Sequence, residues 1–321
     1  MKTIFTNFLL LSKLHSRNYH SIELFNEAYY NFEINHAKVV LNNNLNNSFL
    51  MELNHFFDLS EDQFVKKIKN CFSPGASPPT PTLEKVGVGH FEWAGVAGVG
   101  GLAPLHIDWT TLNAVTPIKN QGQCGSCWSF SATGAIEGAY AIKTGDLLSF
   151  SEQQLIDCSS EYGNQGCNGG EMNNAFQYAI DNGICLENDY PYKAIDQTCS
   201  AVASCNKIKI SRFVDVTKNN QLALKQAVAK GPVSVGIEAD TKIFQFYKSG
   251  IVSSITCGTN LDHGVTLVGY GENNDVKYWK IKNSWGEQWG DKGYMKIERS
   301  DSENDKGICG IAMSASYPII D

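Results

Sequence analysis

The spacing of apolar residues predicts helices through the middle of the chain. One amphipathic helix face is formed by five residues at positions i, i+3, i+4, i+7 and i+8: Met172, Ala175, Phe176, Ala179 and Ile180. Gly183 follows as a stop signal for this helix. Another helix should begin near Cys127 and end at Gly145, and Ser151 with Gln154 forms a capping box ahead of a third helix.

The last third of the chain changes to strand-like runs. After a short helix at about residues 219–230, the stretches that predict strands, separated by glycine-containing turns, are residues 233–238, 265–270, 278–282 and 293–298. Helices first and antiparallel strands second predict an α+β fold, with a mainly helical half at residues 103–212 and a mainly β half at residues 213–321. We expect the functional cleft between the two halves.

The N-terminal part of the chain differs in composition from both halves. Residues 1–69 are rich in Asn, Phe and Leu and predict a separate helical unit. Residues 70–102 combine prolines and glycines, which favours an extended linker. The apolar run at residues 4–11 is not followed by a small-residue cleavage site, so we expect it to belong to the folded chain rather than to a signal peptide.

Composition narrows the functional classes. The 321 residues carry a net charge of −7 and are 42% hydrophobic. This acidic balance disfavours nucleic acid and anionic membranes as partners, because phosphates attract basic surfaces. No stretch approaches the roughly 20 apolar residues that a membrane span requires. Ten cysteines are many for a reduced cytosolic protein and favour a secreted or lysosomal location.

The segment from Gln121 to Trp128, with the sequence QGQCGSCW, contains the strongest chemical signal. Cys127 lies where a loop meets the predicted helix, and the partial positive charge of a helix N-terminus stabilises a thiolate, which is the nucleophilic form. A Cys-x-x-Cys pair is also typical of a zinc half-site or a redox centre. Zinc would require a second ligand pair at similar spacing and the redox centre a βαβ context, and the sequence predicts neither.

Three motifs in order make this chain resemble the papain-like cysteine proteases. Cys124-Gly-Ser-Cys-Trp128 matches the nucleophile signature of that family. Far downstream, His263 lies in the sequence LDHGVTLVGYG and Asn283 in KNSWGEQWG. The resemblance covers residues 103–321 and implies a papain-like fold, in which a helical domain faces an antiparallel β-barrel-like domain.

The resemblance implies a role for each motif residue. Cys127 would be the nucleophile, and His263 the base that takes its proton and later protonates the leaving amine. Asn283 would orient the imidazole. Gln121 would donate to the oxyanion together with the backbone N–H of Cys127. The alternative for His263 is a buried core histidine at the start of a strand.

The resemblance also assigns a substrate cleft. Gly169 and Gly170 resemble the backbone-binding segment of the family, where glycine permits close approach of an extended peptide. The pocket for the second residue before the scissile bond (P2) is expected to be lined by Met172, Gly236, Leu261, Gly264 and Ser314. Apolar walls and a floor without a carboxylate predict a preference for Leu or Phe at P2.

Four further residues are assigned to the cleft. Glu171 replaces a usually apolar residue and is expected to attract basic groups at the rim. Trp289 is expected on the leaving-group side. Trp285 is expected to shield the bond between His263 and Asn283, with ordinary core packing as the alternative. For Asp262, a local salt bridge or cap is the alternative to a role in the cleft.

The same resemblance assigns the cysteines to different roles. Cys127 must stay free to act as the nucleophile, and Cys71 falls in the linker, outside the peptidase domain. The family pattern implies three disulfides, which are Cys124–Cys167, Cys158–Cys199 and Cys257–Cys309. Cys185 and Cys205 remain, and their pairing is inferred only by elimination.

The N-terminal unit is similar to the pro-region of cathepsin L-like zymogens in part. Phe32, Asn35 and Val39 follow the second half of a helical signature, whereas Leu24 and Ala28 depart from its first half. The resemblance implies that residues 1–69 inhibit the enzyme and that residues 70–102 pass through the cleft in the reverse direction to substrate. Maturation would cut near residues 101–106, and protonation of carboxylates on acidification would trigger it. An unrelated Asn-rich helical extension is the alternative.

Together these features predict a cysteine endopeptidase that is made as a zymogen and uses no cofactor or metal. The expected partners are peptide and protein substrates, the chain's own propeptide and cystatin-type inhibitors, and we expect a monomer. Two alternatives stay open: a non-catalytic binding protein on the same scaffold, and a peptide ligase in which an amine resolves the thioester. The sequence does not separate a hydrolase from a ligase.

Overall fold

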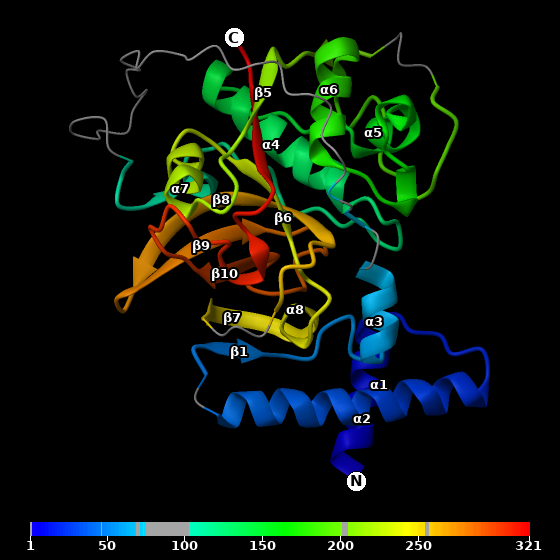
Figure 1. The fold of residues 1–321 in the computed structure, drawn as a ribbon. Coiled ribbons are helices and arrows are strands. Elements are labelled where there is room, and N and C mark those ends of the chain that lie inside the picture. The colour runs from blue at the N-terminus through cyan, green and yellow to red at the C-terminus, as the bar shows by residue number, and fades with distance from the viewer. Residues whose placement is uncertain are drawn as a thin grey trace.

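The computed structural model describes residues 2–45, 47–68, 71, 72, 74, 103–200, 205–253 and 257–321. Three parts follow one another along the chain: an N-terminal helical unit (residues 2–68), a mainly helical half and a mainly β half (Figure 1). In Figure 1 the N-terminal unit forms the bottom of the view, the sheet the middle, and α4, α5 and α6 the top. The predicted α+β class is confirmed.

The helical half is built on α4 (Cys127–Thr144), which is buried along most of its length. Gly145 ends α4 with a left-handed φ of 86°, a conformation that glycine adopts without steric cost. α5 (Glu152–Cys158) begins at the predicted cap, where Ser151 Oγ accepts a backbone N–H. α6 (Met172–Asn182) packs its predicted apolar face against α4. These three helices hold the loop that leads into Cys127.

The β half is dominated by one sheet, whose strand order is β1-β7-β10-β9-β8-β6-β11-β5, with β2 beside β8. The pairs are antiparallel except for β7 with β10. The strands of this sheet are β1 (Phe49–Met51), β2 (Ile107–Asp108), β5 (Arg212–Asp215), β6 (Val233–Ile237), β7 (Tyr247–Val252), β8 (His263–Asn273), β9 (Val276–Lys282), β10 (Tyr294–Glu298) and β11 (Ala315–Ile319). A separate pair is formed by β3 (Ile184–Cys185) and β4 (Lys207–Ile208). Each of the four predicted strand-like runs overlaps one of these strands.

Two features of the sheet position the site. All five residues of β6 are buried, because α4 packs against both β6 and β8. The chain also crosses between the halves, since β2, from the start of the predicted helical half, pairs with β8. Short helices complete the fold: α7 (Gln221–Val228), α8 (Lys242–Phe246), and the 3₁₀ turns Trp109–Thr111, Ser160–Tyr162, Gly166–Asn168 and Ile308–Gly310.

The N-terminal unit has its own small core. α1 (Lys2–Leu14) crosses α2 (Ile22–Asn44), and the rings of Phe8, Phe32 and Phe57 are fully buried between them. The apolar run at residues 4–11 therefore lies in a packed helix. α3 (Glu61–Ile68) then leads from this unit toward the helical half (Figure 1).

The N-terminal unit is joined to the sheet by a strand and by aromatic contacts. β1 pairs antiparallel with β7, so the sheet continues from one part of the chain into the other. Nδ2 of Asn54 donates to the carbonyl of Gln245 at 2.8 Å. The rings of Phe56 and Phe64 meet Trp285 edge-on, with centroid distances of 5.5 and 5.8 Å. These contacts place the N-terminal unit directly beside the cleft.

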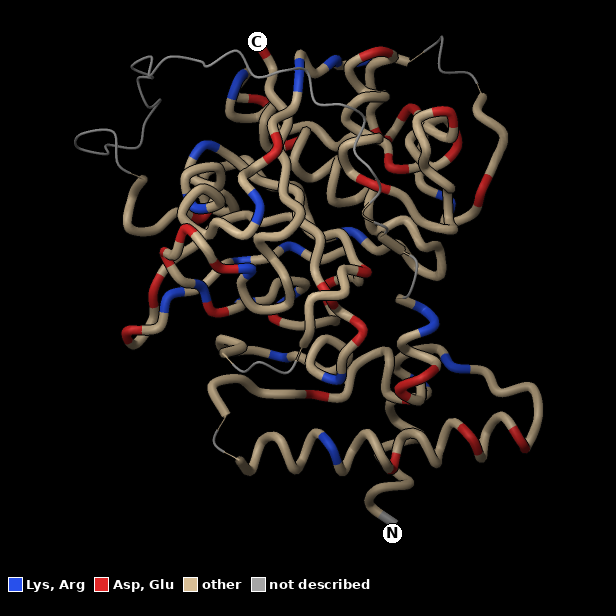
Figure 2. Tube along the Cα trace, in the orientation of Figure 1, with Lys and Arg blue, Asp and Glu red and all other residues tan. Residues whose placement is uncertain are grey.

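Charges of both signs are interspersed along the described trace, without a single-sign stripe in the view of Figure 2. Among the described residues, the structure contains no helix with the length and apolar character that crossing a bilayer requires.

Candidate active site

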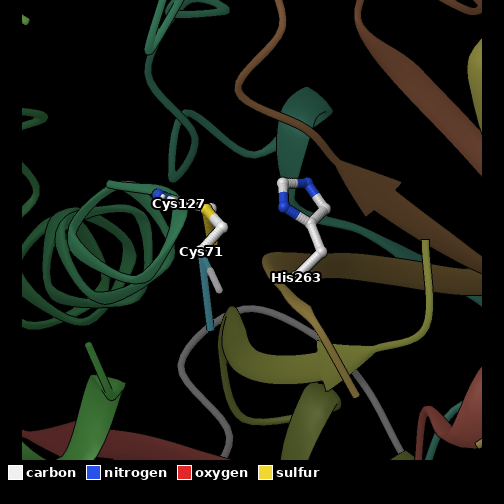
Figure 3. A group of neighbouring side chains, drawn as sticks. All are labelled: Cys71, Cys127 and His263. Atoms are coloured by element: carbon white, nitrogen blue, oxygen red, sulfur yellow. Dashed lines mark hydrogen bonds between the residues drawn. A yellow bond between two sulfur atoms is a disulfide. The ribbon is translucent and has the colours of Figure 1, made fainter. Parts of the chain in front are cut away.

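The predicted nucleophile and base are each the first residue of a long element. Cys127 begins α4 and His263 begins β8, and both are fully buried where the helical half meets the sheet. The imidazole of His263 faces the sulfur of Cys127 (Figure 3). Gln121 lies in the loop before α4, and Asn283 directly follows β9. The structure therefore brings together four residues that are far apart in the sequence.

The imidazole of His263 is oriented by Asn283. Nε2 of the ring lies 2.8 Å from Oδ1 of Asn283, and the same oxygen accepts the backbone N–H of Ser284 at 2.8 Å. Because Oδ1 acts as an acceptor, Nε2 carries the proton, and Nδ1 of the neutral ring keeps its lone pair. Among the described residues, buried Nδ1 has no hydrogen-bond partner. This nitrogen is available to take a proton from Cys127.

Burial lowers the pKa of His263 to about 4, although the hydrogen bond with Asn283 acts in the opposite direction. A negative charge on Cys127 would favour the imidazolium form, since opposite charges attract strongly in a site that excludes water. The ring of Trp285, 3% exposed, lies 4.7 Å from the His263 ring and keeps water from it. The protonation of His263 is thus coupled to the state of the neighbouring sulfur.

Two donors converge on one position beside Cys127. Nε2 of Gln121 and the backbone N–H of Cys127 both point to the same sulfur, that of Cys71, at 3.4 and 3.0 Å. The Gln121 amide is held in this orientation by Ser284, whose hydroxyl donates to Oε1 at 2.6 Å. Two N–H groups aimed at one point can stabilise a negative oxygen that develops there.

The expectation of a free Cys127 thiol is wrong for the state described. Cys127 forms a disulfide with Cys71, so all described cysteines are paired. The sulfurs of Cys71 and Cys127 and a ring nitrogen of His263 lie within 4.8 Å of one another (Figure 3). A cluster of this composition can ligate a metal, but sulfurs that share a disulfide are not thiolate ligands. The expectation failed because it assigned Cys71 to a linker and considered no partner for it.

Phe72 follows Cys71 into the cleft. Its backbone N–H donates to the carbonyl of Asp262 at 3.1 Å, and it forms a parallel bridge with Gly170. Its ring lies so close to Gly236 that a Cβ added there would be 2.4 Å from Cε1. Phe72 therefore occupies the position where the sequence predicts an apolar pocket. The remaining linker residues that were expected in the cleft, apart from Pro74, lie outside the described residues.

The residues predicted for this pocket are gathered around Phe72. Met172 and Leu261 belong to the same buried apolar cluster as the Phe72 ring. A Cβ added at Gly264 would lie 3.2 Å from the sulfur of Met172, so a larger residue would crowd the pocket wall. The carbonyl of Ser314 accepts the N–H of Gly236 at 2.8 Å, which ties β6 to the segment before β11. Gly169, which has a φ of 113°, directly precedes Gly170, the bridge partner of Phe72.

Three further residues predicted for the cleft are buried in this structure. Trp289 is fully buried with the N-terminal unit in place: its ring packs edge-on against Trp285, and its indole N–H donates to the carbonyl of Phe244. Glu171 is only 5% exposed, so its side chain is not at an open rim. Oδ1 of Asp262 accepts the N–H of Ala239 at 2.8 Å, which is the local cap given as the alternative. Burial raises the pKa of Asp262 to about 7.

The other disulfides lie away from the reacting atoms. The structure joins Cys124 to Cys167, Cys158 to Cys199, Cys185 to Cys205 and Cys257 to Cys309. The first of them fixes the loop before α4, and the N–H of Gly125 donates to the carbonyl of Cys167 at 3.0 Å. This loop contains Gln121 and leads to Cys127, so the disulfide supports the geometry of the site.

Sequence reasoning missed two residues that shape the site. Cys71 was given no partner. In an oxidising compartment, however, the two cysteines that remained without a disulfide, Cys71 and Cys127, could have been expected to pair. Ser284 was quoted only as part of a motif, yet its backbone and hydroxyl orient both Asn283 and Gln121. Its position directly after Asn283 was the available signal.

Comparison with known proteins agrees with this geometry. Residues 103–319 match the family described as papain family cysteine protease. Thiol protease SEN102 of Hemerocallis sp. is 45% identical over 271 residues, which are 84% of this chain and 73% of that protein. The cathepsin L-like peptidase of Aedes aegypti is 42% identical over 318 residues, 96% of this chain and 86% of that protein.

A solved structure extends the similarity to the N-terminal unit. The crystal structure of the Amb a 11 cysteine protease, a ragweed pollen allergen in its proform, superposes with a TM-score of 0.86 at 35% identity. The match covers 100% of this chain and 95% of that chain, so it includes residues before the papain-family match. The chain therefore belongs to the papain family of cysteine proteases.

Proposed function

We propose that this chain is a cysteine endopeptidase made as an inactive zymogen, with Cys127 as nucleophile and His263 as general base and acid. The observation that carries the proposal is the hydrogen bond of 2.8 Å between His263 and Asn283, which directs the free lone pair of Nδ1 toward the Cys127 sulfur. A hydrolase of this kind requires that alignment of nucleophile, base and orienting residue.

The reaction would proceed in two stages once Cys127 is a free thiol. Transfer of its proton to His263 gives a thiolate–imidazolium pair, which the start of α4 and the N–H of Gly264, 3.2 Å from the sulfur, would stabilise. The thiolate attacks the scissile carbonyl, and its oxygen becomes negative at the position now facing Gln121 and the Cys127 N–H. His263 then protonates the leaving amine, and water resolves the thioester.

The proposed substrate preference is a bulky apolar residue at P2. Phe72 supports this preference, because its ring lies against Gly236 and belongs to the same buried apolar cluster as Met172 and Leu261. The parallel bridge of Phe72 with Gly170 supports a binding mode in which the linker runs opposite to an antiparallel substrate. We infer that Leu and Phe at P2 are preferred over charged residues, since the pocket offers no described partner for a charge.

We further propose that residues 1–69 are the inhibitory pro-domain and that residues 70–102 are the linker that follows it. Cleavage near residues 101–106 would remove both. The support is the docking of β1 on β7 and of Phe56 on Trp285, which covers the approach to the site. Five disulfides favour secretion or a lysosomal compartment. Cystatin-type inhibitors would reach the same cleft after the pro-domain leaves.

The test is activation of the full chain at about pH 5 in a dithiol reductant, since acid favours release of pro-segments. Chain length and hydrolysis of a fluorogenic peptide with Phe or Arg at P2 are followed together. We expect a fragment that begins near residue 103, with Phe cleaved faster than Arg. Cys127→Ala should show neither processing nor hydrolysis.

Three results would contradict the proposal. Equal activity of Cys127→Ala and wild type would exclude Cys127 as the nucleophile. A mature fragment that binds peptide but releases no product would favour a binding protein. A product that contains an added amine nucleophile, in place of the hydrolysed acid, would favour a ligase.

A further inference from the structure

We propose that the Cys71–Cys127 disulfide is a regulatory covalent bond of the zymogen, which a dithiol reductant must open before the enzyme can mature or act. The bond joins a residue of the N-terminal linker to the proposed nucleophile, across 56 positions of sequence. The inference rests on the proposed role of Cys127. It goes beyond that role by making reduction, and not acid alone, a condition for activity.

The disulfide blocks two functions of the site at once. Cys127 has no thiol to ionise while its sulfur is bonded to Cys71, so His263 has no proton to accept. The Cys71 sulfur also accepts the N–H of Cys127 and Nε2 of Gln121, which are the donors proposed for the oxyanion. A carbonyl oxygen cannot occupy that position while the sulfur is there. Loosening the pro-domain by acid would leave both blocks in place.

Non-covalent contacts hold Cys71 at this position independently of the bond. Its N–H donates to the carbonyl of Ile68 at the end of α3, at 3.1 Å. Phe72 is fixed by the carbonyl of Asp262 and by its pocket beside Gly236. Nζ of Lys67 lies 2.6 Å from Oε1 of Gln123, in the loop before Cys127. The two thiols would thus stay close after reduction, and the disulfide re-forms readily under oxidising conditions.

Burial sets the conditions for reduction. Cys71 is 2% exposed and Cys127 is fully buried, so a reductant reaches the bond only when the segment around Phe72 opens. Reduction of the bond therefore requires both the opening of the cleft and the supply of a dithiol. Removal of the Phe72 ring should make the same bond easier to reduce.

The exchange is a two-electron reaction with a defined course. One thiolate of the dithiol attacks the Cys71 sulfur, forms a new S–S bond to it and displaces Cys127 as a thiolate beside His263. The second thiol of the reductant then loses its proton and attacks the reductant's own sulfur in this mixed disulfide, which releases Cys71 as a thiolate. The reductant ends as a cyclic disulfide. Its two protons end on Cys71 and on the Cys127–His263 pair.

The first experiment measures the bond without using activity. Cells that express the full chain are quenched in acid, free thiols are blocked with light N-ethylmaleimide under denaturing conditions, and disulfides are then reduced and labelled with the heavy reagent. The tryptic peptide of residues 70–85 contains Cys71 as its single cysteine. We expect heavy label on this peptide in the wild type and light label in Cys127→Ser. Light label in the wild type would overturn the proposal.

The second experiment tests the regulatory consequence with Cys71→Ser. Under anaerobic conditions without reductant, at about pH 5, we expect this variant to mature and to hydrolyse substrate at least about 100-fold faster than the wild type. The wild type should reach the same rate after treatment with dithiothreitol. Phe72→Ala should still require dithiothreitol, but it should mature about 10-fold faster than the wild type after dithiothreitol is added. Cys205→Ser, which frees a thiol in a different disulfide, is the matched control and should keep the wild-type requirement.

The outcomes separate this proposal from the proposed function. If wild type and Cys71→Ser mature equally without reductant, the disulfide is not regulatory, and the protease assignment stands. If neither variant acts even in dithiothreitol, the protease assignment fails, while the labelling result still decides whether the bond exists.

Discussion

At the scale of single residues, the donors beside Cys127 serve two occupants in turn. In the zymogen they contact the sulfur of Cys71, and in catalysis they would contact a developing oxyanion. The hydroxyl of Ser284 holds the Gln121 amide ready for both. A group that is oriented before the reaction needs no rearrangement when charge develops, which is the basis of its effect on rate.

The contribution of Gln121 can be measured in the mature enzyme. We expect Gln121→Ala to lower kcat by about 10²–10³ with little change in KM, because the lost donor matters mainly when the oxygen is negative. Gln123→Ala, in the same loop but directed at Lys67 of the N-terminal unit, should leave kcat unchanged. If Gln121→Ala instead raises KM and leaves kcat unchanged, Gln121 binds the substrate rather than the transition state.

A second residue-scale prediction concerns a buried cation behind the site. Nζ of Lys119 lies 2.8 Å from Glu137 and 2.6 Å from Glu152, and both carboxylates are 1% exposed. Lys119→Met leaves two carboxylates without their cation, so we expect a loss of about 3–5 kcal/mol in the free energy of unfolding. Denaturant unfolding of the full chain measures this loss. Adding Glu137→Gln and Glu152→Gln to the variant should recover part of the lost free energy of unfolding. A loss below about 1 kcal/mol would show that other groups neutralise the pair.

The residues of the site were predictable to different degrees. Cys127, His263, Asn283 and Gln121 stand in motifs whose order is specific, so their association followed from the sequence. The partner of Cys71 did not, because a contact between a linker and a cleft leaves no periodic pattern in either segment. The burial of Trp289 was not predictable either, because an aromatic residue beside a cleft motif carries no signal of whether it lies at the surface or one layer below.

At the scale of elements, the helices were easier to predict than the strands. α4, α5 and α6 have clear caps and stops at Ser151, Gly145 and Gly183. The long strands β8 and β9 were found through their apolar runs. β1, β2, β3, β4 and β5 were missed, because they are two to four residues long and acquire their strand character from partners distant in sequence. This explains why β2 was assigned to the helical half. β7 and β11, of six and five residues, were also missed.

The aromatic contact between the N-terminal unit and Trp285 predicts how firmly the cleft is covered. Phe56→Ala with Phe64→Ala removes both rings that meet Trp285, and such truncations cost about 3–5 kcal/mol each when fully buried. We expect the reduced double variant to mature at least about 10-fold faster at about pH 5. Leu50→Ala, at a residue that is 50% exposed, should mature at the wild-type rate. An unchanged rate in the double variant would mean that these rings do not limit release.

At the scale of the whole molecule, acid acts on histidines of the N-terminal unit. Burial lowers the pKa of His55 to about 3, and the positive charges of His15, Lys67 and Arg17 add to the effect. The pKa of His15 is lowered as well, again mainly by burial. The titrating groups of the N-terminal unit that respond to acid are therefore histidines, in addition to the carboxylates that the sequence suggested.

The sign of this effect follows from the direction of the shift. The folded pKa of His55, about 3, is below its ordinary value of 6.5, so the folded N-terminal unit is favoured above pH 6.5 and loses that advantage as pH falls toward 3. At about pH 5 the loss is about 2 kcal/mol. His55→Gln cannot take up the proton, so we expect the midpoint pH for maturation of the reduced zymogen to fall by at least about half a unit.

The same experiment contains its own control. Asp262, with a pKa raised to about 7 by burial, acts in the opposite direction, because its protonation on acidification favours the folded state. This contribution belongs to the protease half and is the same in wild type and His55→Gln. Equal midpoints for the two proteins would exclude His55 as a determinant of acid release.

The pairing of β1 with β7 has a consequence for the enzyme after maturation. β7 lies between β10 and β1, so loss of the N-terminal unit uncovers a sheet edge whose N–H and C=O groups can template another extended chain. The N–H of Ile251, which now donates to the carbonyl of Ser48, would be among the groups set free. Lys248, now paired with Glu52 at 2.5 Å, would regain an unpaired charge at that edge. Solubility of the mature enzyme would then depend on this lysine, which is of the residue type that protects natural sheet edges from aggregation.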